Sequence, residues 1–132
     1  MREVKRYTIL SAKGATGLGN FIQVSDFRNC VVQVATASSA NLTIKCKGAL
    51  GATAPTFVEG SKSAANAWEY VAMVDLNTPT TVVTGSTGLA FTGTDDVRLF
   101  EININSLDWL TFDVTARSAG SVTVTITLTD NR

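Results

Sequence analysis

Residues 121–129 read Ser-Val-Thr-Val-Thr-Ile-Thr-Leu-Thr, a strict alternation of polar and apolar side chains. Successive side chains of a β-strand point to opposite faces, so this stretch predicts a strand with one apolar face and one threonine face. β-Branched residues also suit a pleated surface. Burying the apolar side chains would contribute roughly 6–10 kcal/mol as an upper estimate, so we expect this strand in the core. The apolar face carries Val122, Val124, Ile126 and Leu128.

The same alternation recurs upstream and predicts most of the other strands. Further strands are expected at 6–10, 20–24, 30–36, 42–46, 68–76, 80–84, 88–92, 97–104 and 110–116, with glycine, serine, asparagine and proline turns between them. No window shows the apolar period of a helix, and the best helical candidate is one turn within 61–67. The sequence therefore predicts an all-β protein: a single antiparallel β-sandwich, jelly-roll-like, with about eight to ten short strands.

The length and composition fit one domain. The chain has 132 residues, with 45% hydrophobic and 17% charged residues, and no repeat or linker divides it. We expect a single domain over 1–132 with a short N-terminal arm at about 1–5. A long irregular loop is expected at about 48–67, and loops of this length in compact domains are often functional.

The charge and the cysteine content limit the classes of binding partner and the cellular compartment that we expect. The 11 basic and 11 acidic residues give no net charge, whereas nucleic-acid binders carry a basic excess. No secretion signal follows Met1, and the apolar runs are far shorter than the roughly 20 residues that cross a bilayer. Cys30 and Cys46 form no disulfide framework, and Cys46 is expected to be buried and reduced. We expect synthesis in a host cytoplasm, with neither nucleic acid nor a membrane as partner.

The sequence contains no arrangement typical of catalysis. Without histidine, the Ser-His-Asp and Cys-His systems and HExxH zinc sites are excluded. The glycine-rich stretch at 14–19 lacks the following helix that a phosphate-binding loop needs. Asp95 and Asp96 are adjacent in a turn, where they are expected to face water rather than to flank a substrate or bind Ca²⁺. We expect a protein that is not an enzyme and holds no cofactor or metal.

Two groups of residues are candidates for protein contacts. Arg2, Lys5 and Arg6 form a basic cluster at the N-terminus, which is either a solvated end or an arm lying on an acidic neighbour. Phe57 and Val58 are apolar residues of the long loop. They either fold back over the edge of the sheets or pack against a partner subunit.

Trp109 is the third candidate. Trp68 and Tyr70 lie two residues apart, share a strand face, and are expected in the core. If Leu110 and Phe112 point inward, Trp109 points outward or lies at the start of its strand. An exposed tryptophan at the rim of a sheet is typical of a contact surface.

The order of several segments resembles small β-sandwich structural proteins of tailed bacteriophages. The likeness covers most of the chain through loose patterning, although segment 49–63 is longer than in the plainest members. It implies a virion component, with capsid decoration or cementing as the commonest role. The segments are Tyr7-Thr-Ile-Leu10, Phe21-Ile-Gln-Val24, Asp26-Phe-Arg-Asn29, Val31-Val-Gln-Val34, Asn66-Ala-Trp68, Ile104-Asn-Ser-Leu107-Asp-Trp109 and Ser118-Ala-Gly-Ser-Val-Thr-Val124.

Two classes of function follow from these observations. The first is a structural protein located in the virion, a homo-oligomer with a trimer favoured, whose partners are other virion proteins and above all the major capsid protein. A neck, tail or baseplate position is the close alternative. The second class is a carbohydrate-binding module that adsorbs to a host glycan. The residues expected to make contacts are Arg2, Lys5, Arg6, Phe57, Val58 and Trp109.

Overall fold

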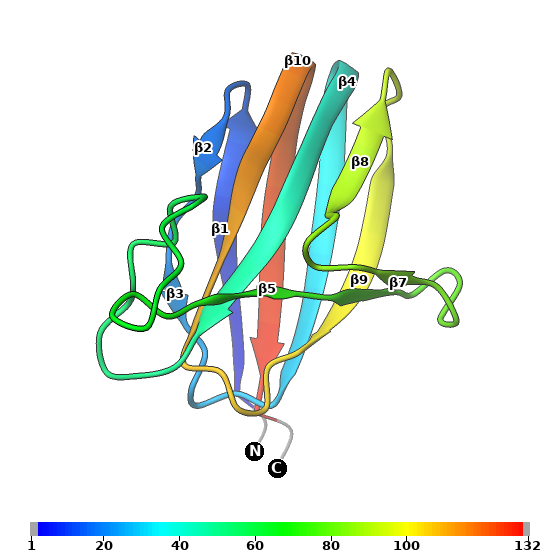
Figure 1. Ribbon diagram of the computed structural model, residues 1–132. Helices are drawn as coiled ribbons and strands as arrows, with labels where there is room; N and C mark the ends of the chain where they lie inside the picture. The colour runs from blue at the N-terminus through cyan, green and yellow to red at the C-terminus, as the bar shows by residue number, and fades with distance from the viewer. Residues whose placement is uncertain (1–2, 131–132) are drawn as a thin grey trace.

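Two long strands run through the whole molecule. The computed structural model describes residues 3–130. Within it, β4 (Asn29–Ala49) and β10 (Trp109–Thr129) each contain 21 residues. They pair antiparallel over their full length, from Asn29 opposite Thr129 to Ala49 opposite Trp109. Figure 1 shows both strands passing through the centre of the molecule and folding over at the same end.

All ten strands belong to one antiparallel sheet. Its main path is β1-β10-β4-β9-β6-β7, with β2 and β3 also beside β10, and β5 and β8 also beside β4. The chain ends pair with each other, because Val4 lies opposite Thr129. The remaining strands are β1 (Val4–Lys13), β2 (Gly17–Leu18), β3 (Ile22–Gln23), β5 (Glu69–Val71), β6 (Met73–Asp75), β7 (Val82–Val83), β8 (Leu89–Thr92) and β9 (Val97–Asn103).

The sheet is folded over on itself, because β4 and β10 bend at matching positions. Their register shifts between 114 and 121 of β10, opposite 37–43 of β4. At the bend Ser38 and Ser39 have φ of 63° and 53°, and Gly120 has φ of 77°. We call the part with β1, β9, β6 and β7 the first half-sheet, and the part with β2, β3, β5 and β8 the second half-sheet. Figure 1 shows one lying in front of the other.

The β8–β9 loop holds the bend closed. It connects a strand of the second half-sheet to a strand of the first, and its backbone bonds to β4 on both sides of the bend. The amide of Gly93 donates to the carbonyl of Ala40 over 2.8 Å, and the amide of Asp96 donates to Thr36 Oγ1 over 2.8 Å. The carboxylate of Asp95 accepts a bond of 3.3 Å from the Ala40 amide. Asp95 and Asp96 therefore stabilise the turn in which the sequence analysis expects them, through hydrogen bonds to β4.

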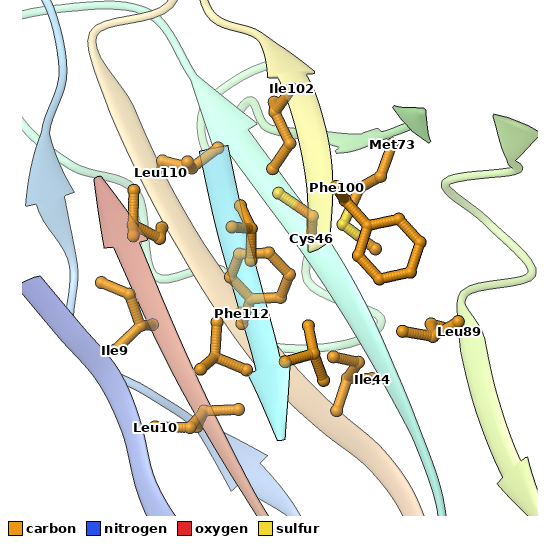
Figure 2. Close-up of a cluster of buried hydrophobic side chains, with 14 of the residues drawn as sticks. Ile9, Leu10, Ile44, Cys46, Met73, Leu89, Phe100, Ile102, Leu110 and Phe112 are labelled. Carbon is orange, nitrogen blue, oxygen red and sulfur yellow. The ribbon is translucent and has the colours of Figure 1, made fainter. Parts of the chain in front are cut away.

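The core fills the space between the two half-sheets. Figure 2 shows Ile44, Leu110 and Phe112 of the second half-sheet meeting Phe100 and Ile102 of the first. The apolar face of the stretch at 121–129 lies in this core without solvent exposure, as predicted. Its members are Val122, Val124, Ile126 and Leu128.

The predicted all-β class is confirmed, since residues 3–130 contain no helix. The jelly-roll-like sandwich of the prediction is not confirmed, because hydrogen bonding joins the ten strands of residues 3–130 into one sheet. The predicted strands at 30–36 and 42–46 are one strand, as are those at 110–116 and 121–129. The serine and glycine residues between them bend β4 and β10 without ending them, because the two strands bend together and stay paired.

Two other boundaries differ from the prediction. The expected strand at 68–76 divides into β5 and β6, which pair with β4 and β9 respectively. The chain thereby crosses from the second half-sheet to the first. Of the N-terminal arm expected at about 1–5, Val4 and Lys5 belong to β1, and residues 1 and 2 lie outside the described residues.

We expect Gly120→Ala to destabilise the fold more than Gly60→Ala. Both glycines have a positive φ, 77° and 84°, so each alanine pays about 1–2 kcal/mol of backbone strain. A Cβ on Gly120 would also lie 2.4 Å from Ala40 Cα, whereas nothing lies within 4 Å of one on Gly60. The free energy of unfolding, measured in urea, should therefore fall by at least about 1 kcal/mol more for Gly120→Ala. Equal losses would contradict a tightly packed bend.

Both cysteines are expected to be inert in the folded protein. Cys30 and Cys46 are free and buried, as predicted for Cys46. Burial raises the pKa of Cys30 from 9.0 to about 12 and raises that of Cys46 as well. A disulfide-exchange reagent should label neither thiol at pH 8 until urea unfolds the chain. The unfolded chain ionises its thiols first, so the free energy of unfolding should fall as pH rises above 9.0. Rapid native labelling would show that the core opens.

Candidate interaction surfaces

The basic N-terminal cluster is only partly within the described residues. Arg2 lies outside them. Lys5 and Arg6 are exposed on β1, opposite Leu128 and Thr127 of β10. Both side chains are therefore accessible from solvent, on the edge strand of the first half-sheet. Their role in protein contacts stays a prediction.

The long loop at 50–68 is ordered by its own hydrogen bonds. Asn66 lies at its centre: its Oδ1 accepts from the Thr56 amide over 2.9 Å, and its Nδ2 donates to the Ser61 carbonyl over 3.1 Å. Ser63 forms an isolated bridge with Asn66, where the sequence suggested a helical turn. Figure 1 shows the loop beside the lower part of the second half-sheet, near β2 and β3. The loop therefore has a defined conformation that its own hydrogen bonds stabilise.

The loop packs on the outer face of the second half-sheet through aromatic rings. Phe57 has no exposed surface and Trp68 is 4% exposed, and together with Ala49 they form a small second core. The ring of Phe57 meets that of Phe21 edge-on, with centroids 5.0 Å apart. Phe57 thus folds back onto its own sheet and is not free for a partner, whereas its neighbour Val58 is 52% exposed.

Lys47 of β4 holds the loop against the sheet. Its side chain has no exposed surface although it lies on the outer face of β4. Its Nζ donates to Asp113 Oδ2 over 2.7 Å and to the carbonyl of Phe57 over 2.8 Å, and lies 2.9 Å from Glu59 Oε2. The same nitrogen lies 4.5 Å from the ring centroid of Trp68. The sequence alternation gave no sign of this buried charge.

Glu59 completes the charged cluster. Its Oε1 accepts a hydrogen bond from the Tyr70 hydroxyl and lies 3.9 Å from Lys45 Nζ. Desolvation by itself would raise the pKa of Glu59, but the hydrogen bonds from Tyr70 and Lys47 outweigh it and the net shift is downward. The hydrogen bond to Glu59 chiefly raises the pKa of Tyr70, to about 12. Glu59 is therefore held as a carboxylate.

Trp109 points to the outer face of the sheet, as predicted, but the loop covers it. Its indole Nε1 donates to the carbonyl of Gly51 over 3.0 Å, and its ring packs partly buried against the second core. The neighbouring Asp108 carboxylate accepts a bond of 2.6 Å from the Gly51 amide. Trp109 therefore contacts its own loop, and a contact with a partner stays a prediction.

One open apolar surface was not singled out in the sequence. Leu99 and Val97 of β9 are 45% and 64% exposed, Leu76 next to Leu99 is 39% exposed, and Val82 of β7, one strand farther, is 55% exposed. We call these four residues the β9 face. Leu76 and Leu99 are joined by a backbone bond of 3.1 Å, and a groove of about 470 Å³ runs alongside, with the ion pair of Arg98 and Asp75 in its lining.

A sequence signal for the β9 face did exist. The sequence predicts a strand at 97–104. Its odd positions include Val97 and Leu99, however, and its even positions include Phe100 and Ile102, so it has apolar residues on both faces. Such a strand is either covered on both sides or leaves one apolar face open. Here the face with Leu99 is open.

The described residues show no metal site. Among residues 3–130, no three histidine, cysteine, aspartate or glutamate side chains gather in one place. Within the same range, no helix has the length and apolar character to span a membrane.

Comparison with known proteins gives a fold likeness. The fold is similar to that of the SPBc2 prophage-derived protein YomS, with a TM-score of 0.71 and 14% identity over 98% of this chain and 95% of that one. It is also similar to part of the PBSX exported protein XepA, with a TM-score of 0.67 and 13% identity over 97% of this chain and 38% of that one. No family model matches the sequence. No curated protein matches it either.

We expect Trp109→Ala to loosen the loop while the main core stays intact. The change removes the Nε1 bond to Gly51 and part of the ring packing beneath the loop. Limited proteolysis should then cut within 50–68 at least about tenfold faster, which corresponds to about 1.4 kcal/mol of local opening. Trp109→Phe keeps an aromatic ring but loses the hydrogen bond to Gly51, so its proteolysis rate should lie between those of the wild type and Trp109→Ala. Unchanged proteolysis would show that Trp109 does not hold the loop.

Proposed function

We propose that the protein is a structural component of a phage virion, and in the first instance a capsid decoration protein that binds the capsid surface as a homo-oligomer. The observation that carries the proposal is the β9 face. Exposed apolar side chains that gather on one side of a sheet commonly mark protein contacts. The proposed occupant is another virion protein, with the major capsid protein as the leading candidate.

Three features support a role in assembly. The chain shares its fold with a prophage-derived protein along nearly the full length of both. Its net charge is zero, so little electrostatic repulsion opposes close packing of copies. Finally, Arg98 beside the β9 face is already paired with Asp75, so a partner can cover that arginine without leaving its charge unpaired.

The flat geometry of the face suits a sheet-like or extended partner. On its outer side, Leu99 lies opposite Gln33 of β4, and Val97 lies opposite Ala35. Beyond them follow the threonines of β10 at 123, 125 and 127. The outer surface therefore has apolar residues on the β9 side and hydroxyl groups on the β10 side, and protein interfaces commonly combine the two kinds of surface.

A neck, tail or baseplate position would use the same face against a different virion protein. The carbohydrate-binding alternative required an open platform around Trp109. In the described conformation the loop covers that side chain and Gly51 occupies its indole nitrogen. The alternative therefore receives no support from the geometry.

Incorporation into particles tests the proposal. We expect Leu99→Asp to lower the number of copies per purified particle at least about tenfold, since a charge at the centre of a contact costs more than about 1.4 kcal/mol. Leu50→Asp is the matched control, because Leu50 is 65% exposed on the loop side. Copy number is measured by quantitative mass spectrometry of particles from a phage that encodes each variant.

The outcomes separate the candidate surfaces. Loss with Leu99→Asp alone supports the β9 face. Loss with Leu50→Asp alone moves the contact to the long loop and its neighbours, including Val58. Normal incorporation of both variants, or absence of the wild-type protein from particles, contradicts the proposal.

A further inference from the structure

The Lys47 cluster has a geometry that ordinary ion pairs lack. Its amine nitrogen is 2.7 Å from Asp113 Oδ2, and the side chains of Lys47 and Asp113 are 0% and 7% exposed. A second carboxylate oxygen, Glu59 Oε2, is 2.9 Å from the same nitrogen. An amine, a carboxyl group and a neighbouring carboxylate are thus fixed together away from water.

The surroundings exclude water from this cluster. The Trp68 ring lies over Lys47 Nζ at 4.5 Å, and Phe57 closes the loop above it. The side chains of Lys47 and Asp113 have at most 7% of their surface exposed, so little water can contact the reacting atoms. A buried ion pair in such a place carries a desolvation penalty of several kcal/mol per ion.

We propose that Lys47 and Asp113 condense into an intramolecular isopeptide bond, with Glu59 as the proton carrier. The lone pair of Nζ, freed when the ammonium group gives up a proton, attacks Cγ of Asp113 and forms the C–N bond. One C–O bond of the carboxyl group then breaks. Two of the three ammonium protons leave with that oxygen as one water molecule, and the third remains on the amide nitrogen.

The step balances without any further reagent. The positive charge of Lys47 and the negative charge of Asp113 disappear together, nothing is oxidised or reduced, and Glu59 ends as it began. Two groups that are held in contact can reach effective concentrations on the order of 10⁵ M or more. Positioning therefore removes a large part of the activation barrier of the condensation. Exclusion of water opposes the reverse hydrolysis, and loss of the two charges relieves the desolvation penalty.

Glu59 is placed to carry protons in this step. Its Oε2 faces Lys47 Nζ, while the Tyr70 hydroxyl and Lys45 hold its Oε1. Its pKa is lowered, so Glu59 is an ionised carboxylate with an oxygen facing the ammonium group, and this position allows it to take one proton and pass it on. Its side chain is 43% exposed, so it connects the buried pair to solvent, where the released water can leave.

The same face carries a natural comparison pair. Lys62 Nζ and Glu69 Oε1 are 2.6 Å apart, as close as the proposed pair, but their side chains are 43% and 68% exposed. In water both groups stay charged, and an ammonium ion is no nucleophile. Condensation is therefore expected at Lys47 and not at Lys62.

Mass spectrometry of the purified, denatured protein tests the bond directly. The intact wild-type mass should be one water molecule below the mass of the sequence, after any removal of Met1 is accounted for. A tryptic digest should contain a branched peptide joining Lys47 to Asp113, with no cleavage after Lys47. Lys62 should be unlinked. An intact mass equal to that of the sequence overturns the proposal, and so does a loss of water confined to one unbranched peptide.

Two variants test the assigned roles. Lys47→Arg keeps the positive charge but not the primary amine, and it should restore the full mass. Glu59→Gln keeps both reacting groups and changes a partly exposed side chain; circular dichroism checks that it folds. It should slow the appearance of the linked species at least about a hundredfold, in line with the loss of a general acid–base group. Linkage in Glu59→Gln at the wild-type rate removes Glu59 from the proposal.

Discussion

The full-length pairing of β4 with β10 is the constraint on which the rest of the structure depends. Two strands of 21 residues are too long to lie flat in a domain of this size, so they bend, and they bend together because each supplies the other's hydrogen-bond partners. The bend brings two halves of one sheet face to face, and the shared core forms between them. Two features allow this bend. Gly120 has no side chain and so lets β10 lie close to β4, and the β8–β9 loop forms hydrogen bonds to β4 at the bend.

The two outer faces of the folded sheet are treated differently. The long loop, anchored by Lys47, covers the second half-sheet with its own aromatic core around Phe57 and Trp68. No such loop covers the first half-sheet within residues 3–130, where Leu99 and Val97 remain open. This asymmetry is the reason that we propose the β9 face as the contact surface. Phe57 packs against its own sheet, whereas Val58 stays exposed and its contact with a partner stays a prediction.

Much of the fold follows from residue patterns, because burial of one face imposes a period of two. The faces of 121–129 and of 42–46 were predicted correctly for that reason, and so was the burial of Cys46. The bends were not predicted, since Ser38-Ser39 and Ser118–Gly120 have the composition of chain reversals and only the partner strand shows that they continue. Lys47 was missed for a related reason: it alternates onto the polar side with Lys45, and its burial depends on a loop that returns from elsewhere in the chain.

The pairing of the chain ends has a mechanical consequence. Val4 and Thr129 are neighbours at the open end of the folded sheet, away from the bend. Tension applied through the two ends would therefore peel β1 from β10 one hydrogen bond at a time, beginning at Val4. Strands loaded in this zipper geometry yield at lower force than strands sheared along their length, because the bonds do not share the load. A neighbour that pulled on both ends would therefore open the sheet from its β1 edge.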